Sequence, residues 1–503
     1  MIARFGPHHQ SMLAVLQLAA ESATPWHWVV VAFTLLGEVL ALIFIVRVLE
    51  RGGAPATTLM WVVVILLAPW FGIGLYYLFP RRLQLRRLKR IAQQQRRWRG
   101  GTRGSRTTEL LSVREAEAQQ EGSLHRLLRG LVPDSVSFGN AVRWLPSGED
   151  FFAAARLAMA RAQHFVHIEI YIFRPDPTGL AFLALLESVA RRGVAVRLLY
   201  DSLGSFSLKA RHLAALRKAG GRAEPCLPLL WKRRPFTVNL RNHRKQIIVD
   251  GDVVLLGGRN IADEYATDRL GQKHAWFDAM VQIQGPAVAD LHHVFLEDWF
   301  NATDEDLQDP RFLAGADRKG NECVGAARSG PDGVTKVLWF SVFQVINDAR
   351  YSLEISSPYL VPPPSMLIAL VVAASRGVRV RIFTNGRATE AVVLHQAQRS
   401  YYRELVSAGV EIYETIDDYN HAKVLVADNR TVMVGSANFD MRSAHLNFEL
   451  AVVLPDSPSF ARDVLATLDS RALASRRIEL GQLRNSRLQR VIDGICRLLS
   501  PIL

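Results

Sequence analysis

The sequence is poor in cysteine, with only Cys226, Cys323 and Cys496 among 503 residues. Because these three are odd in number and far apart, they form neither a disulfide framework nor a Cys-x-x-Cys metal site. The scarcity indicates a reducing compartment. A chain of this length is also too long for one compact core, so we expect two or more domains.

Acidic charge is scarce as well. The chain holds 47 Asp and Glu against 61 Lys and Arg, which leaves a formal charge of +14. This balance favours polyanionic partners, either nucleic acid or an anionic lipid surface, and does not choose between them. Hydrophobic residues make up 49% of the chain, enough to include membrane segments.

Two long apolar runs lie near the N-terminus, at 26–48 and 59–79. A spanning helix needs about 20 apolar residues, so after an N-terminal segment 1–25 we predict two transmembrane helices within 26–80. Glu38 argues for a buried core helix instead of the first span, whereas Trp26 and Trp28 are typical of interfacial anchors. The second run has no charge, and Pro69 is tolerable there as a kink.

Residues 81–125 follow as a basic juxtamembrane linker, with arginines gathered directly after the second run. The positive-inside rule therefore places everything beyond residue 80 in the cytoplasm and the hairpin loop outside. A cleaved signal peptide is excluded because the first run is too long and lacks a cleavage site. The linker is either simply solvated or attracted to anionic headgroups.

From residue 126 the pattern changes to strands alternating with helices, as in α/β proteins. RGVAVRLLYD (192–201) and RGVRVRIFTN (376–385) align without a gap, which predicts two similar halves at 126–310 and 311–503. The second half ends in RLQRVIDGICRLLSPIL, an amphipathic helix that packs on its domain or lies at a membrane interface.

A longer repeat, NHRKQIIVDGDVVLLGGRN (242–260) and NHAKVLVADNRTVMVGSAN (420–438), carries chemistry. The matching positions are His243 and His421, Lys245 and Lys423, Asp250 and Asp428, Gly257 and Gly435, and Asn260 and Asn438. Each copy predicts a hairpin with its tight turn at Asp250-Gly251 or Asp428-Asn429. In a strand, residues two apart face the same way, so each His and Lys project together.

This arrangement suits a phosphate: Lys offers charge, His offers a nucleophile or a proton, and the Asn amide donates hydrogen bonds. A metal site is a poor alternative, because protonated Lys is not a ligand and no Cys or second His lies at ligand spacing. One copy alone is a weak signal. Two copies with the same offsets predict one site built from two halves.

The two motifs, HRKQIIVD with GGRN and HAKVLVAD with GSAN, resemble the paired HKD signatures of the phospholipase D superfamily. The chain further resembles bacterial cardiolipin synthases in the segments HIEIYIF, RRGVAVRLLYDSLGS, ISSPY, GSANFDMRS and LNFEL. The resemblance implies two tandem α/β/α domains related by pseudo-twofold symmetry, whose histidines meet in one site without metal or other cofactor. It also implies a multi-pass protein of the bacterial inner membrane with cytoplasmic catalytic domains.

By this resemblance, His243 attacks phosphorus to form a phosphohistidine, while His421 protonates the leaving alkoxide and then deprotonates the incoming alcohol. Asp250 and Asp428 complete the catalytic motifs as structural or charge-positioning members. The residues expected to hold the phosphate are Lys245, Lys423, Asn260, Asn438 and Ser436. Glu449 in LNFEL and Asp278 in WFDAMV are expected to orient the histidines, the alternative being ordinary surface ion pairs.

The implied reaction joins two phosphatidylglycerols into cardiolipin and releases glycerol, with the membrane and no nucleic acid as partner. Alternatives are a phospholipase D-type hydrolase, a transferase using another donor such as phosphatidylethanolamine, a superfamily nuclease, and a non-catalytic membrane scaffold. Two departures from the family pattern, Arg259 in GGRN and the absence of an Asp-His dipeptide in 384–396, concern the headgroup rather than the phosphodiester chemistry.

Overall fold

The computed structural model describes residues 25–50, 55–78, 122–132, 136–227, 240–266, 276–307, 312, 317–331, 336–386, 392–483 and 486–499. It divides into two compact units, Met1–Leu85 and Arg86–Leu503. The predicted segment 1–25, the hairpin loop and the basic linker lie almost entirely outside the described residues. The orientation predicted from them stays a prediction.

The first unit holds three helices, α2 (Pro25–Glu50), α3 (Pro55–Leu67) and α4 (Pro69–Leu78). Within α2, Trp28–Glu50 is the one helix of the described ranges that is long and apolar enough to cross a bilayer. Its Phe44 and Val48 pack with Ile65 of α3 in a small buried cluster. Most of the remaining apolar side chains of α2 are exposed in this unit, as a lipid-facing helix requires.

The predicted second span is not one helix. Helices α3 and α4 have 13 and 10 residues, whereas a span needs about 20. Pro69 has no N–H to donate to the preceding turn, so the helix breaks at Ala68. A Cβ on Gly72 would lie 2.8 Å from the Cα of Ile65, so α4 folds closely against α3. The prediction of two spanning helices in a multi-pass protein is therefore wrong.

The second unit is built on one hydrogen-bonded series of strands whose order repeats outward from its middle. One direction runs β1 (Val136–Leu145), β9 (Met280–Gln284), β7 (Val253–Gly257), β6 (Gln246–Val249), β2 (Phe165–Ile170), β3 (Ala195–Asp201) and β4 (Arg222–Cys226). The other runs β10 (Glu322–Ser329), β19 (Asn447–Leu454), β17 (Thr431–Gly435), β16 (Val424–Ala427), β11 (Ser352–Ser356), β13 (Arg379–Thr384), β14 (Glu411–Thr415) and β20 (Ser475–Arg477).

The two directions match strand for strand from the β1–β10 junction as far as β4 and β14. Strands β2 and β3 pair in parallel from Phe165↔Ala195, and β11 and β13 pair in parallel from Ser352↔Arg379. This equivalence confirms the repeat that the sequence predicts. Because β10 pairs with both β1 and β19, the halves share one sheet, and the boundary near 310 stays a prediction.

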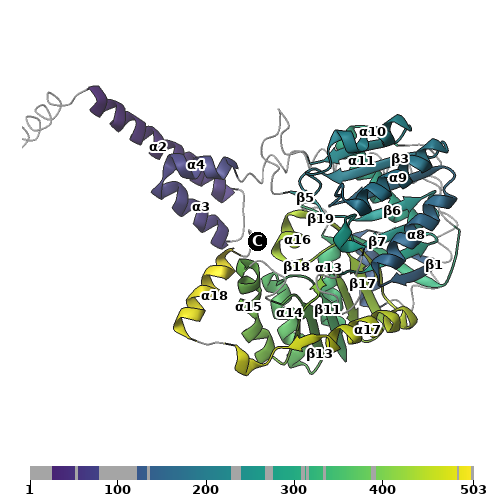
Figure 1. The fold of residues 1–503 in the computed structure, drawn as a ribbon. Helices are drawn as coiled ribbons and strands as arrows, with labels where there is room; N and C mark the ends of the chain where they lie inside the picture. Colours follow the sequence, from purple (N-terminus) through teal and green to yellow (C-terminus); the bar gives the residue numbers. More distant parts are fainter. Residues whose placement is uncertain are drawn as a thin grey trace, which may run out of the picture. The chain divides into compact units, whose positions relative to one another are not determined.

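Helices cover both faces of the sheet, and Figure 1 shows the two halves as the blue-teal and green-yellow parts of the chain. The helices of one face are called the outer helices. They are α8 (Gly148–Arg161), α9 (Pro177–Arg191) and α10 (Ala210–Lys218) in the first half, and α13 (Val337–Asp348), α14 (Pro364–Ser375) and α15 (Val392–Ser407) in the second. The opposite face carries α11 (Ala287–Thr303) and α17 (Pro458–Leu473). The core under α11 and α17 includes strands from both halves.

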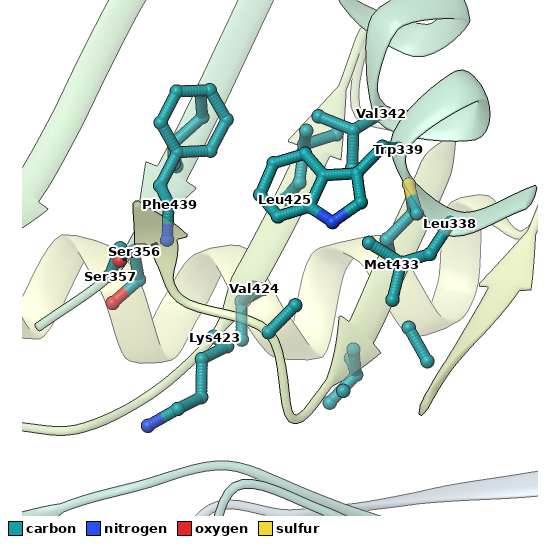
Figure 2. Close-up of a pocket in the computed structure, with 15 residues that line it drawn as sticks. Leu338, Trp339, Val342, Ser356, Ser357, Lys423, Val424, Leu425, Met433 and Phe439 are labelled. Atoms are coloured by element: carbon teal, nitrogen blue, oxygen red, sulfur yellow. Dashed lines mark hydrogen bonds between the residues drawn. The ribbon is translucent and has the colours of Figure 1, made fainter. Parts of the chain in front are cut away.

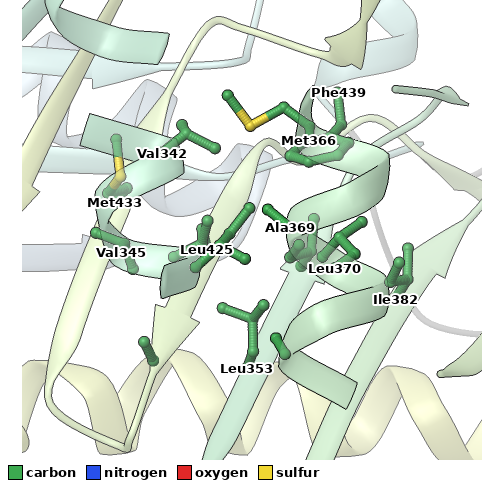
Figure 3. Packing of buried hydrophobic residues seen from close by; sticks show 14 of the residues in the cluster. Val342, Val345, Leu353, Met366, Ala369, Leu370, Ile382, Leu425, Met433 and Phe439 are labelled. Carbon is green, nitrogen blue, oxygen red and sulfur yellow. The ribbon is translucent and has the colours of Figure 1, made fainter. Parts of the chain in front are cut away.

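The outer helices are held by apolar side chains that recur at helical spacing. In the second half, Val342 and Val345 of α13 and Leu370 of α14 pack on Leu353 of β11 and Leu425 of β16, as Figure 3 shows. Each such fully buried aliphatic side chain contributes about 1.5–3 kcal/mol to folding. This packing fixes β16, which begins directly after His421 and Lys423 of the second motif.

Candidate active site

Two very short strands carry the histidines from one half into the other. Strand β5 (Arg241–Asn242) pairs with the start of β19, and β15 (Tyr419–Asn420) pairs with β8 (Trp276–Phe277). The backbone N–H of His243 donates to the Phe448 carbonyl at 2.9 Å, and that of His421 donates to the Phe277 carbonyl at 2.7 Å. The backbone of each histidine is thereby hydrogen-bonded to the half of the unit that does not contain that histidine.

Each imidazole is also oriented by an acid of the opposite half. His243 Nδ1 lies 3.0 Å from Glu449 Oε1, and His421 Nδ1 lies 2.6 Å from Asp278 Oδ2. Because a carboxylate only accepts, Nδ1 carries the hydrogen and Nε2 keeps a lone pair. Both acids are fully buried, so a surface ion pair is excluded for either.

The two lysines lie buried beside the histidines. Lys245 Nζ donates to the His243 carbonyl at 2.5 Å, and Lys423 Nζ donates to the His421 carbonyl. Burial lowers the pKa of Lys245 to about 7 and that of Lys423 to about 8, and repulsion from Lys423 adds to the effect at Lys245. An anion in the site would restore the charge of both.

Burial also lowers the pKa of His243 to about 4 and that of His421 to about 3. Lys245 and Lys423 lower both values further, which means that charges from the two halves act on one space. Burial raises the pKa of Glu449 and Asp278, but the neighbouring histidines and lysines outweigh it and hold both below their usual values. At neutral pH the site combines neutral imidazoles with ionised acids.

An apolar pocket lies under Lys423. Figure 2 shows its amine at the edge of a pocket that is lined deeper by Trp339, Met433 and Phe439. Ala437 of GSAN lines the same pocket.

Arg259, which departs from the family pattern and corresponds to Ala437, has a structural position. Its guanidinium is fully buried and donates to the carbonyls of Pro146, Tyr265 and Asp278 at 2.9, 3.0 and 2.6 Å. These bonds fix the backbone of the acid that orients His421. Arg259 is a positioning residue of the first half, and its presence carries no information on the headgroup.

Ser436 lies beside the acid that orients His243. Its hydroxyl donates to Glu449 Oε2 at 2.5 Å and accepts from the Leu450 N–H at 3.0 Å. The single hydrogen of the hydroxyl is thus used to hold the acid that orients His243. These hydrogen bonds give Ser436 a positioning role, and substrate binding by Ser436 stays a prediction.

The two asparagines of the motifs differ. Asn260 Oδ1 accepts from the Ile172 N–H at 2.9 Å, and its amide donates to the Tyr265 hydroxyl at 2.8 Å. Asn438 Oδ1 is buried and has no hydrogen-bond partner within the described part of the chain. Binding of phosphate oxygens by either asparagine stays a prediction.

Asp250 and Asp428 lie away from the histidines. At about 3.3 Å per strand residue, five residues place each of them about 16 Å beyond its motif lysine. Asp250 accepts from the backbone N–H groups of Gln163, His164 and Phe165 at 2.7 to 2.8 Å, and Asp428 accepts from those of residues 350–352. These hydrogen bonds agree with the structural role expected for both, and their membership of the catalytic set stays a prediction.

Aromatic side chains that the sequence did not single out surround the imidazoles. The Tyr171 ring lies edge-on to His243 with centroids 4.8 Å apart, and Lys245 Nζ lies 5.3 Å from the same ring. Tyr265 and Trp276 lie 5.4 and 5.5 Å from His421. Tyr171 directly follows β2, and the rule that strand ends line sites could have identified it.

Known proteins match this chain over nearly its whole length. The family described as "Cardiolipin synthase, PLD-like domain" matches residues 156–299 and 342–471, and "Phospholipase_D-nuclease N-terminal" matches 39–81. The cardiolipin synthase of Halalkalibacterium halodurans is 33% identical over 95% of both chains. That of Geobacillus thermodenitrificans is 36% identical over 92% of both.

The chain belongs to the cardiolipin synthase family of the phospholipase D superfamily. The two matched segments contain the histidines, lysines and orienting acids of the site, with His243 in the first segment and His421 in the second. The match at 39–81 covers the end of α2 with α3 and α4, and α2 supplies the N-terminal membrane-anchoring helix of the family.

A solved structure shares the fold. The phosphatidylserine synthase of Haemophilus influenzae Rd KW20 superposes with a TM-score of 0.58 at 15% identity, over 76% of this chain and 100% of that one. At this identity the likeness concerns the fold alone. It agrees with an α/β phospholipase D-like unit that contains two related halves.

Proposed function

We propose that this enzyme transfers the phosphatidyl group of one phosphatidylglycerol to a hydroxyl of another, forming cardiolipin and releasing glycerol. One observation carries the proposal: two neutral histidines, each held at Nδ1 by an acid of the opposite half, share a space with two buried lysines. Family membership supplies the substrate class. We also propose the bacterial inner membrane as its location, with the catalytic unit in the cytoplasm.

In the first step, His243 Nε2 attacks phosphorus and the bond from phosphorus to the glycerol oxygen breaks. Lys245 and Lys423 stabilise the charge that develops on the phosphate oxygens. The bound phosphodiester offsets the two lysine charges, which lower the pKa of His421. Its pKa therefore rises on binding, and His421 can deliver a proton to the leaving glycerol oxygen.

In the second step, a glycerol hydroxyl of another phosphatidylglycerol loses its proton to His421 and attacks phosphorus. The phosphorus–nitrogen bond breaks and His243 returns to its neutral form. Glu449 stabilises the His243 imidazole while it carries the phosphatidyl group, because the substituted ring is cationic. The proton that His421 takes up from water on substrate binding passes to glycerol in the first step and is regained from the incoming hydroxyl in the second, so atoms and protons balance without a further reactant.

The test is to incubate the purified full chain with phosphatidylglycerol and follow cardiolipin, glycerol and phosphatidic acid together. Equal amounts of cardiolipin and glycerol support the proposal. Phosphatidic acid as main product indicates a hydrolase, and a requirement for added phosphatidylethanolamine indicates another donor. Absence of any turnover would favour the non-catalytic scaffold.

The roles of the histidines are tested with phosphatidylglycerol labelled at phosphorus. His421→Ala should retain protein-bound, acid-labile label, because attack proceeds slowly without the acid and discharge lacks its base. His243→Ala should retain none. Label found only in His243→Ala would reverse the assignment, and its absence from the wild type and both variants after rapid quench would contradict the covalent route.

A further inference from the structure

Helix α18 (Arg487–Leu499) is the predicted C-terminal amphipathic helix, and one of its faces is exposed. Leu488, Val491 and Ile495 are 70%, 59% and 53% exposed. Spacings of three and four residues put them in one row along the helix. An exposed row of large aliphatic side chains on a helix indicates a surface for a partner.

The opposite face of α18 is fixed to α15, and Figure 1 shows the two helices side by side. Asp493 accepts from the Gln396 amide at 3.0 Å, and Arg497 donates to the Ser400 carbonyl at 2.6 Å. The Arg497 guanidinium also lies 4.5 Å from the Tyr401 ring. Packing on the domain, one of the two alternatives from the sequence, is confirmed for this face and leaves the exposed row unused.

Two more exposed aliphatic side chains lie in the first turn of α15. The two helices run in the same direction, because 396 faces 493 and 400 faces 497. Val392 and Val393 therefore lie level with the start of α18, and they are 72% and 50% exposed. The apolar patch consists of Val392, Val393, Leu488, Val491 and Ile495.

The patch lies on the side of the sheet that holds the active site. Asn385, at the end of β13, accepts from the Asn420 N–H at 2.6 Å, directly before His421. Gln398 of α15 donates to the Asn385 carbonyl at 2.9 Å. Helix α15 is therefore tied through Gln398 to the backbone directly before the histidine, and α18 is tied to α15 through Asp493 and Arg497.

Basic side chains run beside the apolar row. Arg487 and Arg490 directly precede Leu488 and Val491 and are exposed. The only acid of α18, Asp493, is occupied by Gln396 and Gln489. A basic row next to an apolar row is typical of helices that lie in the interface of anionic membranes.

We propose that the apolar patch inserts into the interface of an anionic bilayer and holds the catalytic unit with its site facing the lipid. The inference rests on the proposed function only in that a lipid substrate must enter from a bilayer. The surface has one occupant, the boundary between headgroups and acyl chains. A second copy of the chain or the N-terminal helices would be different occupants, and the test below separates them.

The direct test places a spin label at Val491→Cys in the full chain on phosphatidylglycerol vesicles. The three native cysteines are buried, and the labelled parent protein gives the background. We expect the label to be reached by oxygen more than by a water-soluble nickel chelate, and a control label at Leu157→Cys, on exposed α8, to show the reverse. Preference for the chelate at 491 would overturn the proposal, and so would protection from both reagents, which indicates a protein partner.

This readout needs no turnover, so repeating it with His243→Ala separates failure of the patch from failure of the proposed function. A kinetic test complements it. Replacement of Leu488, Val491 and Ile495 by Ser should lower activity on vesicles by about threefold to tenfold, because the local concentration of oriented sites falls. Activity on dispersed short-chain phosphatidylglycerol should stay unchanged. Equal losses with Leu157→Ser/Leu180→Ser, which are exposed on α8 and α9, would contradict a specific role.

Discussion

At the scale of single residues, the two halves orient their histidines in different ways. Glu449 is held by the Ser436 hydroxyl and by the Asn447 amide, at 2.5 and 3.1 Å. In the other half the counterpart of Ser436 is Gly258, where a Cβ would lie 2.1 Å from Asp278 Oδ1. The shorter acid therefore comes close to the backbone itself, and a side chain at 258 would displace it.

Removing the charge of an orienting acid should disable its histidine. In Glu449→Gln the amide can present its N–H to Nδ1, which favours the wrong tautomer of His243, and we expect kcat to fall by about 10²- to 10⁴-fold. Ser436→Ala removes one hydrogen bond to the same acid and should cost less than about tenfold. Steady-state kinetics at matched folded fraction checks both, and a larger loss in Ser436→Ala than in Glu449→Gln would contradict these roles.

The buried lysines predict a pH dependence of anion binding. Their lowered pKa values, about 7 and about 8, mean that the positive charge is present below pH 7 and is lost as the pH rises through 7 to 8. The affinity for an oxyanion of constant charge, such as tungstate, should therefore fall between pH 7 and 9, by up to about tenfold per pH unit for each proton taken up.

Inhibition constants across this range provide the measurement. Lys245→Met should weaken tungstate binding at pH 6 and make the affinity depend less on pH, because one titrating group is removed. In the free enzyme the histidines stay neutral down to about pH 4 and 3, so the lysines are the groups of the empty site that lose charge in this window. An affinity that is independent of pH in the parent enzyme would contradict the prediction.

At the scale of elements, the two motif hairpins end in turns with positive φ. Asp250 has φ 53° and Gly251 φ 71°, and Asp428 and Asn429 have φ 52° and 53°. The N–H of Asp252 donates to the Val249 carbonyl at 3.0 Å, which closes the first turn. The hairpins predicted from the sequence are thereby confirmed, together with the reason for Asp, Asn and Gly at these positions.

Asp250→Asn should affect stability and leave catalysis intact. Asn also tolerates positive φ, so the substitution mainly weakens charge-assisted hydrogen bonds to three backbone amides, at a cost of about 1–3 kcal/mol. Thermal or urea unfolding measures the loss, and kcat per folded molecule should stay near that of the parent. The exposed Asp252→Asn is the matched control, with an expected change within about 0.5 kcal/mol. A strong drop in kcat for Asp250→Asn would show that Asp250 takes part in catalysis.

At the scale of the whole molecule, the site exists only where both halves are joined. Strands β1 and β10 pair across the junction, and β5 and β15 each pair with a strand of the other half. Arg328 of β10 also forms a buried ion pair with Glu297 of α11. Unfolding of one half would leave long strand edges and unpaired buried charges on the other.

A chain beginning at Gly122 should therefore fold and unfold in a single transition, seen at the same denaturant concentration by circular dichroism and by tryptophan fluorescence. Two separated transitions would show that the halves are independent. The same chain lacks α2, so activity on vesicles should fall by about tenfold or more, with activity in detergent retained. Equal activity on vesicles at matched concentration would contradict an anchoring role for α2.

The repeat, the two hairpins and the residues that meet at the site could be predicted from the amino-acid sequence alone. These features depend on local periodicity and on fixed offsets within about 20 residues, such as His243 to Asn260 and His421 to Asn438. Even the acids were predicted as a pair. Their positions in the sequence do not show which acid orients which histidine, because Glu449 lies 206 residues from His243 and Asp278 lies 143 residues from His421.

The contacts of the remaining motif residues became known only from the tertiary structure. Ser436 and Arg259 occupy motif positions, but their contacts are to Glu449 and to three carbonyls. The same limit applies to the apolar run at 59–79, where composition favours a span and the missing N–H of Pro69 breaks the helix. Spacing in the sequence indicates which residues come near a site. The hydrogen-bond partner of each polar group depends on how segments distant in the sequence pack together.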